Sequence, residues 1–200
     1  MVRSRLEFAN VSQNQVVASP TNSGIGVGMV GTGFMCKAHA NGYRTLPYMA
    51  YPPPILPDLV AVAGATKASA DMAADRYGFT RVYADWHKML TDPEVHLVDI
   101  CGPNNIHADV AIAAMDAGKH VLCEKPLGRN ADESQQVLEA ARLANTKHMV
   151  AFNYRFVPAV RKARNLIEQG ELGHIRHFRA RYCQDWLTDM EHPQWYEYWE

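Results

Sequence analysis

The sequence lacks the long apolar run that a membrane-spanning helix requires, because none of its 200 residues lies in a stretch of roughly 18 apolar side chains. It also lacks an excess of either charge, since the formal net charge is -1. This balance gives no reason to expect a nucleic-acid partner or binding to an anionic membrane. Residues 1–24 carry basic side chains without the continuous apolar core of a secretory signal, so we expect a loose leader there.

Cysteine is scarce and scattered. The four residues Cys36, Cys101, Cys123 and Cys183 form no CxxC pair and have no metal-ligand spacing. Separated cysteines in a chain of this size predict reduced thiols in a cytoplasmic setting, without a disulfide framework or a metal site. The remaining composition, 48% hydrophobic and 20% charged, is that of a globular chain large enough for one domain and part of another.

Strand-like and helix-like segments alternate from Ile25 onward, which is typical of parallel βαβ units. Short apolar runs predict strands at residues 25–30, 59–63, 81–83, 97–101, 120–123 and 148–151. Helices are expected at residues 34–46, 69–77 and 107–117 and after Asn130, with a short helical turn at 85–90. Five prolines within residues 47–57 predict a surface insertion without helix or central strand. Residues 25–151 are therefore expected to form an α/β domain with a doubly wound parallel sheet of the Rossmann type.

After Phe152 the pattern changes. A helix is expected at residues 158–169, and a strand is expected at 175–182, where apolar and polar side chains alternate. A strand with one apolar and one polar face is typical of a sheet with one solvated side. Residues 152–200 are thus predicted to begin a second, mostly antiparallel α+β domain. His174 and His177 would face opposite sides of that strand, so they are not expected to form a metal pair.

A glycine-rich turn follows the first expected strand directly and opens the first expected helix. Its residues are Gly31-Thr32-Gly33-Phe34-Met35-Cys36, at the dinucleotide-binding position of a βαβ unit. Gly31 permits the tight turn, and Gly33 lets a pyrophosphate approach the backbone. The helix that begins at Phe34 and Met35 offers unpaired N–H groups and a partial positive charge to the anion. Cys36, at the third position of the motif, is a small departure from the usual Gly or Ala.

The end of the second expected strand lacks the Asp or Glu that commonly binds the adenosine ribose of NAD. The residues there are Gly64-Ala65-Thr66-Lys67, with Ser69 close by. Thr66, Lys67 and Ser69 suit a 2′-phosphate, which favours NADP over NAD. The alternative is that Lys67 is an ordinary solvated lysine, so the sequence leaves both cofactors open.

Two further segments follow the carboxyl ends of expected strands, where ligands bind in open α/β sheets. They are Cys101-Gly102-Pro103-Asn104-Asn105-Ile106-His107 and Glu124-Lys125-Pro126. Together with GTGFMCKAHA at residues 31–40 and FNYRFVPA at 152–159, they resemble the Gfo/Idh/MocA family, which includes glucose–fructose oxidoreductase and inositol dehydrogenase. The resemblance covers roughly residues 25–187 and implies a NAD- or NADP-dependent sugar dehydrogenase.

The resemblance implies that Lys125 is the catalytic residue, beside the nicotinamide and the substrate hydroxyl. Hydride transfer from an alcohol carbon needs a group that accepts the hydroxyl proton or stabilises the alkoxide, and a partly desolvated lysine can do either. Glu124 would orient Lys125 or the cofactor. The other residues that the resemblance places near cofactor or substrate are Pro103, Asn104, His107, Asn153 and Arg155.

Two of these assignments have alternatives. His107 is expected to point toward the active site as a second catalytic candidate, or else to cap the helix that follows it. Arg155 contacts substrate or forms a structural salt bridge. Gly102 stands where the family pattern has threonine, so one hydroxyl contact with the cofactor is lost.

The family pattern continues with a Gly-Asp-x-x-x-His segment, whose Asp and His assist the lysine. This chain instead has QDWLTDMEHPQWYEYWE, so no such partner can be assigned. The dense aromatic cluster in that segment, with little chain to cover it, leads us to expect a shortened product.

The sequence thus predicts an NAD(P)-dependent oxidoreductase that transfers a hydride between a nicotinamide cofactor and a sugar, polyol or related hydroxyl substrate. The alternative is a non-catalytic nucleotide-binding or regulatory module that associates through its exposed carboxyl-terminal strand. Association of that kind, as a homo-oligomer, is compatible with both predictions.

Overall fold

The computed structural model describes residues 24–184. They contain a six-stranded sheet in which all neighbouring strands are parallel, in the order β3-β2-β1-β4-β5-β6. The strands are β1 (Gly24–Val30), β2 (Leu56–Ala63), β3 (Arg81–Tyr83), β4 (Leu97–Ile100), β5 (His120–Cys123) and β6 (His148–Val150). The chain winds outward from β1 to β3, returns to β4 and winds out again to β6. The predicted doubly wound sheet is therefore confirmed.

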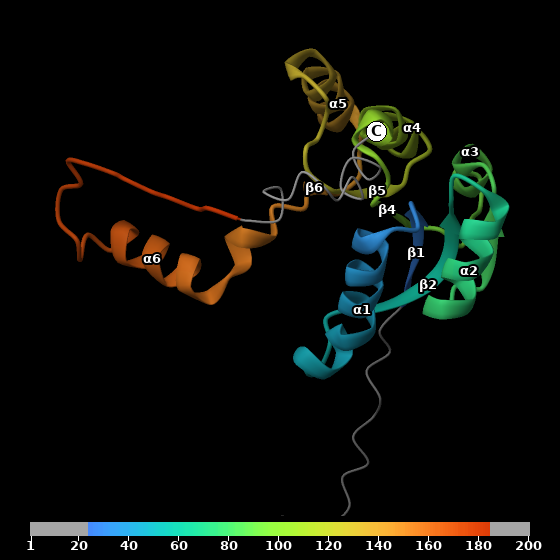
Figure 1. The fold of residues 1–200 in the computed structure, drawn as a ribbon, viewed down its shortest axis with the longest axis horizontal. Helices are drawn as coiled ribbons and strands as arrows, with labels where there is room; N and C mark the ends of the chain where they lie inside the picture. Colours follow the sequence, from blue (N-terminus) through green and yellow to red (C-terminus); the bar gives the residue numbers. More distant parts are fainter. Residues whose placement is uncertain (1–23, 185–200) are drawn as a thin grey trace, which may run out of the picture.

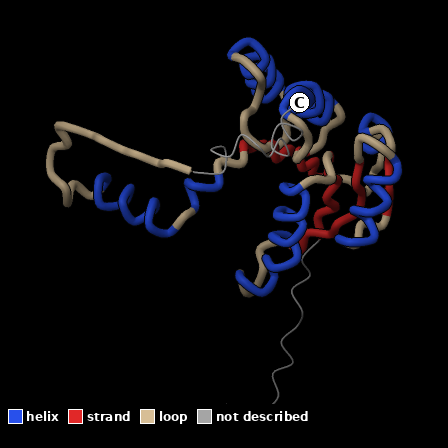
Figure 2. Tube along the Cα trace, viewed as in Figure 1, coloured by secondary structure: helices blue, strands red, loops and turns tan. Residues whose placement is uncertain are grey.

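Helices connect the strands and cover both faces of the sheet. They are α1 (Phe34–Met49), α2 (Lys67–Tyr77), α3 (Trp86–Leu90), α4 (His107–Asp116), α5 (Ala131–Leu143) and α6 (Pro158–Glu168), with short 3-10 turns η1 (Asn104–Ile106) and η2 (Asn153–Phe156). Figures 1 and 2 show α1 and α2 together beside the β1–β2 half, with α4 and α5 packed together beyond β4 and β5. Along the described residues, none of the helices is both long and apolar enough to cross a bilayer.

Two buried clusters hold the helices on the sheet. One joins Val27 and Met29 of β1 to Cys36 and Ala40 of α1 and to residues of α2. The other joins Val30 and alternate residues of β4 to α3, α4 and α5. Successive residues of a strand face opposite sides, so β1 supplies both clusters. This double burial explains why β1 is a continuous apolar run in the sequence.

The predicted proline-rich insertion is wrong at both ends. Pro47 lies inside α1, which continues to Met49, and Pro57 is the second residue of β2. Pro47 removes one N–H donor, but it lies in the last turn of the helix, with only Tyr48 and Met49 after it. Pro57 lies opposite Ile25, near the first residues of both β1 and β2, where the loss of one backbone N–H donor disturbs the sheet least.

The predicted helix at residues 158–169 is confirmed by α6, but the strand expected at 175–182 is wrong. Residues 175–184 form neither helix nor strand, and Phe178 is 82% exposed. Alternation of side chains does not make a strand unless a neighbouring strand supplies hydrogen bonds, and none pairs with it among residues 24–184. In Figure 1, α6 and the segment after it extend away from the sheet.

Two expectations fall outside the part of the chain that the structure describes. The leader was predicted for residues 1–24, of which only Gly24 is described, as the first residue of β1. The aromatic cluster of Trp195, Tyr196, Tyr198 and Trp199 also lies outside the described residues.

Candidate functional site

The carboxyl edge of the sheet brings together four of the predicted segments. The hydrogen-bond ladder continues one residue beyond the central strands: Gly31 N donates to Ala63 O at 2.8 Å, and Cys101 N donates to Val30 O at 2.8 Å. Glu124 N donates in the same way to Ile100 O at 2.9 Å. The loops after β2, β1, β4 and β5 therefore begin side by side. This edge includes the point between β1 and β4 where the direction of winding reverses, at which open α/β sheets bind ligands.

The glycine turn has the geometry that an anion site requires. Gly31 has a φ of +104°, and a Cβ there would lie 2.6 Å from the backbone of Cys101 and Gly102. Gly33 has an ordinary φ of −80°, and a Cβ there would meet nothing within 4 Å. Gly31 is thus required by the fold, whereas Gly33 leaves space in front of the turn.

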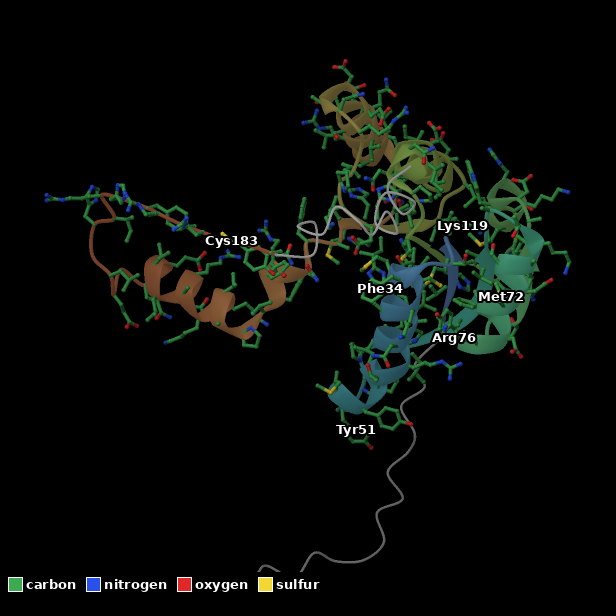
Figure 3. The ribbon with its side chains drawn as sticks, viewed as in Figure 1. Phe34, Tyr51, Met72, Arg76, Lys119 and Cys183 are labelled. Carbon is green, nitrogen blue, oxygen red and sulfur yellow. The ribbon has the colours of Figure 1, made fainter. Side chains whose placement is uncertain are left out.

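The first turn of α1 lies open to a ligand. Among the described residues, no side chain caps this helix, and its first turn contains no acidic residue. Its unpaired N–H groups and partial positive charge are therefore available to a phosphate. Phe34, the first residue of α1, is 71% exposed (Figure 3), while Met35 packs against the cluster beneath α1.

At the end of β2, the candidate ribose-binding residues form the start of α2. Thr66 caps this helix by accepting a hydrogen bond from Ser69 N at 3.1 Å, and Ser69 Oγ accepts in return from Thr66 N at 3.3 Å. The Nζ of Lys67 lies 2.6 Å from a carboxylate oxygen of Asp71, one turn along the helix. Both side chains of that ion pair are exposed, so its contribution to stability is small.

His107 ties two of the loops together. Its Nδ1 lies 2.7 Å from the carbonyl oxygen of Pro126, and its Nε2 lies 3.0 Å from that of Gly102. The side chain is 1% exposed. Both ring nitrogens thus face the backbone instead of the expected open site, and no side-chain cap of α4 is formed. Pro103 is exposed and Asn104 half-buried on the same loop.

Glu124 and Lys125 differ sharply in their surroundings. Glu124 is 6% exposed, and its Oε2 accepts a hydrogen bond from the backbone N–H of Lys125 at 3.1 Å. The Lys125 side chain is exposed at the same edge of the sheet. The glutamate therefore lies beneath the loop and the lysine on its surface.

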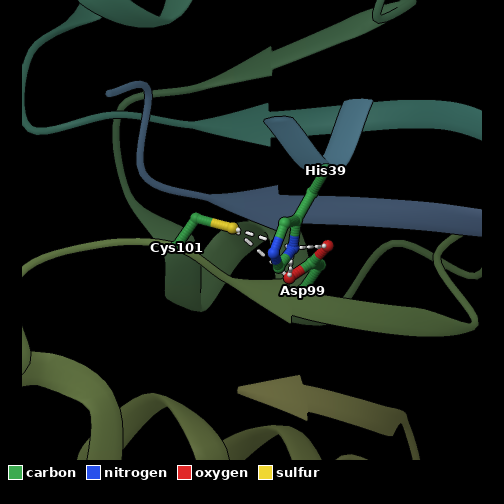
Figure 4. Close-up of side chains that lie close together, drawn as sticks. All are labelled: His39, Asp99 and Cys101. Carbon is green, nitrogen blue, oxygen red and sulfur yellow. Dashed lines mark hydrogen bonds and ion pairs between the residues drawn. The ribbon is translucent and has the colours of Figure 1, made fainter. Parts of the chain in front are cut away.

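The structure reveals a cluster that the sequence analysis missed, built around His39 of α1. The Nδ1 of His39 lies 2.9 Å from Asp99 Oδ2, and its Nε2 lies 3.2 Å from Glu124 Oε1. Asp99, on β4, is fully buried and also accepts from the hydroxyl of Tyr43 at 2.8 Å. Figure 4 shows His39 beside Asp99 and Cys101. The available signal was Asp99 itself, a carboxylate inside the apolar run Leu97-Val98-Asp99-Ile100-Cys101.

The cluster changes the acidity of its members. Burial alone would lower the pKa of His39, but hydrogen bonds to Asp99 and Glu124 and their charges outweigh it and raise that pKa to about 10. Burial opposes ionisation of Glu124, yet the hydrogen bonds from His39 and the Lys125 backbone bring its pKa below the usual value. Burial also raises the pKa of the Cys101 thiol well above normal. The cluster therefore holds an imidazolium between two carboxylates.

His39, Asp99 and Cys101 also have the residue types of a metal site. Their ligand atoms lie within 4.8 Å of one another, the one such grouping found in residues 24–184. The atoms already bond to each other, since Cys101 Sγ lies 3.4 Å from both His39 Nδ1 and Asp99 Oδ1. Hydrogen bonding thus accounts for the arrangement without an ion.

The last two candidate residues lie on η2, after β6. Asn153 and Arg155 are both exposed. Arg155 lines a hollow with Phe156 and residues of α6, namely Arg161, Arg164, Asn165 and Glu168. The structure therefore places Arg155 with α6.

The glycine turn, the open helix N-terminus and the polar residues at the ends of β4 and β5 define a dinucleotide-binding α/β protein. Comparison with known families agrees. Residues 25–152 match the model of the Gfo/Idh/MocA oxidoreductase family, NAD-binding Rossmann fold, and residues 160–200 match a Gfo/Idh/MocA C-terminal domain. The chain belongs to this family, as the resemblance predicted.

Known relatives include several sugar and polyol dehydrogenases. Levoglucosan dehydrogenase of Pseudarthrobacter phenanthrenivorans is 46% identical over 169 residues, which are 84% of this chain and 43% of that protein. Inositol 2-dehydrogenase of Salmonella typhimurium is 36% identical over 139 residues, 66% of this chain and 41% of that protein. A solved structure of levoglucosan dehydrogenase, in complex with NADH and levoglucosan, superimposes with a TM-score of 0.81 and 46% identity, covering 84% of this chain and 45% of the other. The chain thus spans less than half the length of these relatives.

Proposed function

We propose that this chain is the cofactor-binding part of an NAD(P)-dependent oxidoreductase acting on the CH–OH group of a sugar, polyol or related substrate. The observation that carries the proposal is the open space at Gly33 in front of the uncapped N-terminus of α1, at the reversal point of a parallel sheet. Family membership and the dehydrogenase relatives support it. We assign residues 25–151 to the cofactor domain and 152–200 to the start of the second domain.

The first turn of α1, from Gly33 through Phe34 to Met35, would bind the pyrophosphate through backbone N–H groups. Gly31 would keep this turn close to the loop after β4. Along that loop, Pro103 and Asn104 would line the cofactor site. These contacts depend on backbone shape, so they suit either dinucleotide.

When bound, the cofactor supplies the hydride acceptor for the alcohol carbon. We propose that Lys125 accepts the hydroxyl proton as that carbon loses its hydride, so that the alcohol becomes a carbonyl. Exposure of its side chain at the edge of the sheet, directly after buried Glu124, supports this assignment. His107, predicted as a second catalytic residue, is better supported as a positioning residue, because its ring nitrogens lie within hydrogen-bond distance of carbonyl oxygens on the loops that carry Pro103 and Lys125.

We propose that the cofactor choice depends on Lys67. The end of β2 has no carboxylate for a ribose hydroxyl, and the cationic Lys67 at the start of α2 favours a 2′-phosphate. Thr66 and Ser69 already cap that helix, so the preference depends on the lysine. The ion pair with Asp71 opposes that preference, because Lys67 would have to leave it to bind the phosphate. NADH in the levoglucosan dehydrogenase complex supports NAD as the alternative.

The substrate class follows from the relatives, whose names specify levoglucosan and inositol. We propose an anhydrosugar or a cyclic polyol, placed over Lys125 with Asn153 and Arg155 nearby. The test is reduction of NAD or NADP in the presence of levoglucosan or myo-inositol, followed at the absorbance of the reduced cofactor. Turnover that is lost in Lys125→Ala supports the proposal. Cofactor binding without any turnover would favour the non-catalytic nucleotide-binding module.

We further propose a cytoplasmic location and self-association. Four free thiols, of which Cys36, Cys101 and Cys123 are buried, support a reducing compartment. Apolar side chains exposed after β6 support a homo-oligomer, among them Phe152, Tyr154, Phe156 and Phe178. Sedimentation of the purified chain tests this, and a monomer at micromolar concentration would contradict self-association.

A further inference from the structure

The His39 cluster lies directly beneath the loop that carries the proposed catalytic lysine. Both nitrogens of His39 face carboxylate oxygens, Nδ1 toward Asp99 at 2.9 Å and Nε2 toward Glu124 at 3.2 Å. A carboxylate can only accept, so both contacts are hydrogen bonds only when both nitrogens carry protons. With Asp99 and Glu124 both ionised, these two contacts correspond to the imidazolium form of His39.

The two carboxylates need this cation. Asp99 is fully buried and Glu124 is 6% exposed, so water solvates neither of them well. Removing the charge between them would leave two like charges at one side of the sheet, and one carboxylate would have to take a proton or move. Tyr43 and Cys101 add hydrogen bonds to Asp99, but neither carries a positive charge.

Glu124 connects the cluster to the lysine. One of its oxygens, Oε1, accepts from His39, and the other, Oε2, accepts from the backbone N–H of Lys125 at 3.1 Å. The carboxylate is thus held at both ends, and its second bond fixes the peptide from which the Lys125 side chain extends. A change in His39 is transmitted to Lys125 through one side chain.

We propose that His39 is a positioning residue for Lys125, acting as a partly buried imidazolium that joins Asp99 of β4 to Glu124 and so fixes the backbone of the lysine. This inference deepens the proposed function and rests on it for the role of Lys125. The coupling from His39 to Lys125 is a property of the chain alone. It can therefore be measured without a cofactor or a substrate.

The pH dependence of this coupling follows from the groups that face His39. They are the carboxylates of Asp99 and Glu124 and the thiol of Cys101, while the hydroxyl of Tyr43 and the charge of Lys125 act on those carboxylates. With a pKa of about 10, His39 keeps both protons at neutral pH and loses one only in alkaline solution. Loss of that proton releases Glu124 Oε1, so the peptide of Lys125 should respond at the same pH.

The experiment is a 13C-detected NMR titration of the labelled 200-residue chain from pH 6 to 11, which does not depend on labile amide protons. Three signals are followed: His39 Cε1, Glu124 Cδ and the backbone nitrogen of Lys125. We expect all three chemical shifts to change with a single midpoint near pH 10. Circular dichroism should show a folded chain over the whole pH range. In His39→Asn, the last two signals should no longer move at that midpoint. His87→Asn is the matched control, because His87 also pairs with a carboxylate, that of Asp85 at 2.8 Å, but on an exposed surface.

A His39 signal that titrates near 6.5 would overturn the proposal, and so would Glu124 and Lys125 signals that do not follow His39. The wild-type titration can overturn the proposal even if His39→Asn does not fold. His39→Gln then takes the place of that variant, because lysine and tyrosine side chains also titrate near pH 10 and only a His39 variant assigns the midpoint to His39. A parallel titration with NADH separates the two claims. Coupled NMR midpoints without NADH binding would support the role of His39 and contradict the proposed function. NADH binding without coupled midpoints would support the proposed function and contradict the role of His39.

Discussion

Replacement of Gly33 by valine separates cofactor binding from folding. A Cβ at Gly33 meets nothing within 4 Å, and φ is −80° with ψ −155°, an extended conformation without the positive φ that favours glycine. At a helix N-cap, glycine and an apolar residue differ by about 1 kcal/mol. We therefore expect the free energy of unfolding of Gly33→Val to change by no more than about 1 kcal/mol.

Dinucleotide binding should change far more. The new side chain would fill the space in front of the first turn of α1, where a pyrophosphate would reach the free N–H groups. A hydrogen bond to a charged group contributes roughly 1.5–3 kcal/mol, so losing two of them costs about 3–6 kcal/mol. The dissociation constant of NADH should rise at least about 100-fold.

The assay is calorimetric titration with NADH alongside urea unfolding. Gly42→Ala, on the same helix and also without atoms within 4 Å of the added Cβ, should keep wild-type affinity and gain up to about 1 kcal/mol of stability. Gly31→Ala should be destabilised instead, because its φ is +104° and the Cβ would lie 2.6 Å from the Cys101 backbone. Unchanged NADH affinity in folded Gly33→Val would refute the reasoning.

Three further predictions concern charged groups. Burial opposes ionisation of Asp92, but hydrogen bonds from Arg81 outweigh it and lower the Asp92 pKa. Asp92→Asn should therefore cost about 1–3 kcal/mol in urea unfolding, a loss that disappears as pH falls through the lowered pKa. Asp85→Asn, at an exposed carboxylate, should destabilise the chain less than Asp92→Asn does. His39 has a raised pKa, so its contribution to stability should be complete below pH 6.5 and lost as pH rises through about 10. The difference in unfolding free energy between wild type and His39→Asn should therefore shrink between pH 6.5 and 10. Lys67→Ala should weaken NADPH binding about 10-fold and leave NADH binding unchanged in fluorescence titrations, and equal effects on both would contradict a role in cofactor choice.

Much of the fold was predictable because its signals are local. The continuous apolar run of β1 reflects burial on both faces, and the glycine turn after it needs a φ that other residues rarely adopt. The strand expected at 175–182 was wrong because pairing depends on another segment, which side-chain alternation cannot reveal. Pro47 and Pro57 were misjudged because each lies near the end of its element, where a missing donor is tolerated.

The site was predictable where it depends on position along the chain. Glycines after β1 and polar residues after β4 and β5 must meet at one edge, since the strands are parallel and adjacent. The bridge from His39 to Asp99 and Glu124 was missed because it joins α1, β4 and the loop after β5 across 60 and 85 residues of sequence. The orientation of His107 was missed for the same reason, because its partner Pro126 belongs to another loop.

The central claim is that this chain binds a nicotinamide dinucleotide at the N-terminus of α1. The most direct measurement is calorimetric titration of the purified 200-residue chain with NADH and, separately, NADPH. We predict saturable binding of at least one of them at a single site per chain, abolished in Gly33→Val. A chain that is folded by circular dichroism and unfolds cooperatively, yet binds neither dinucleotide, would contradict the account.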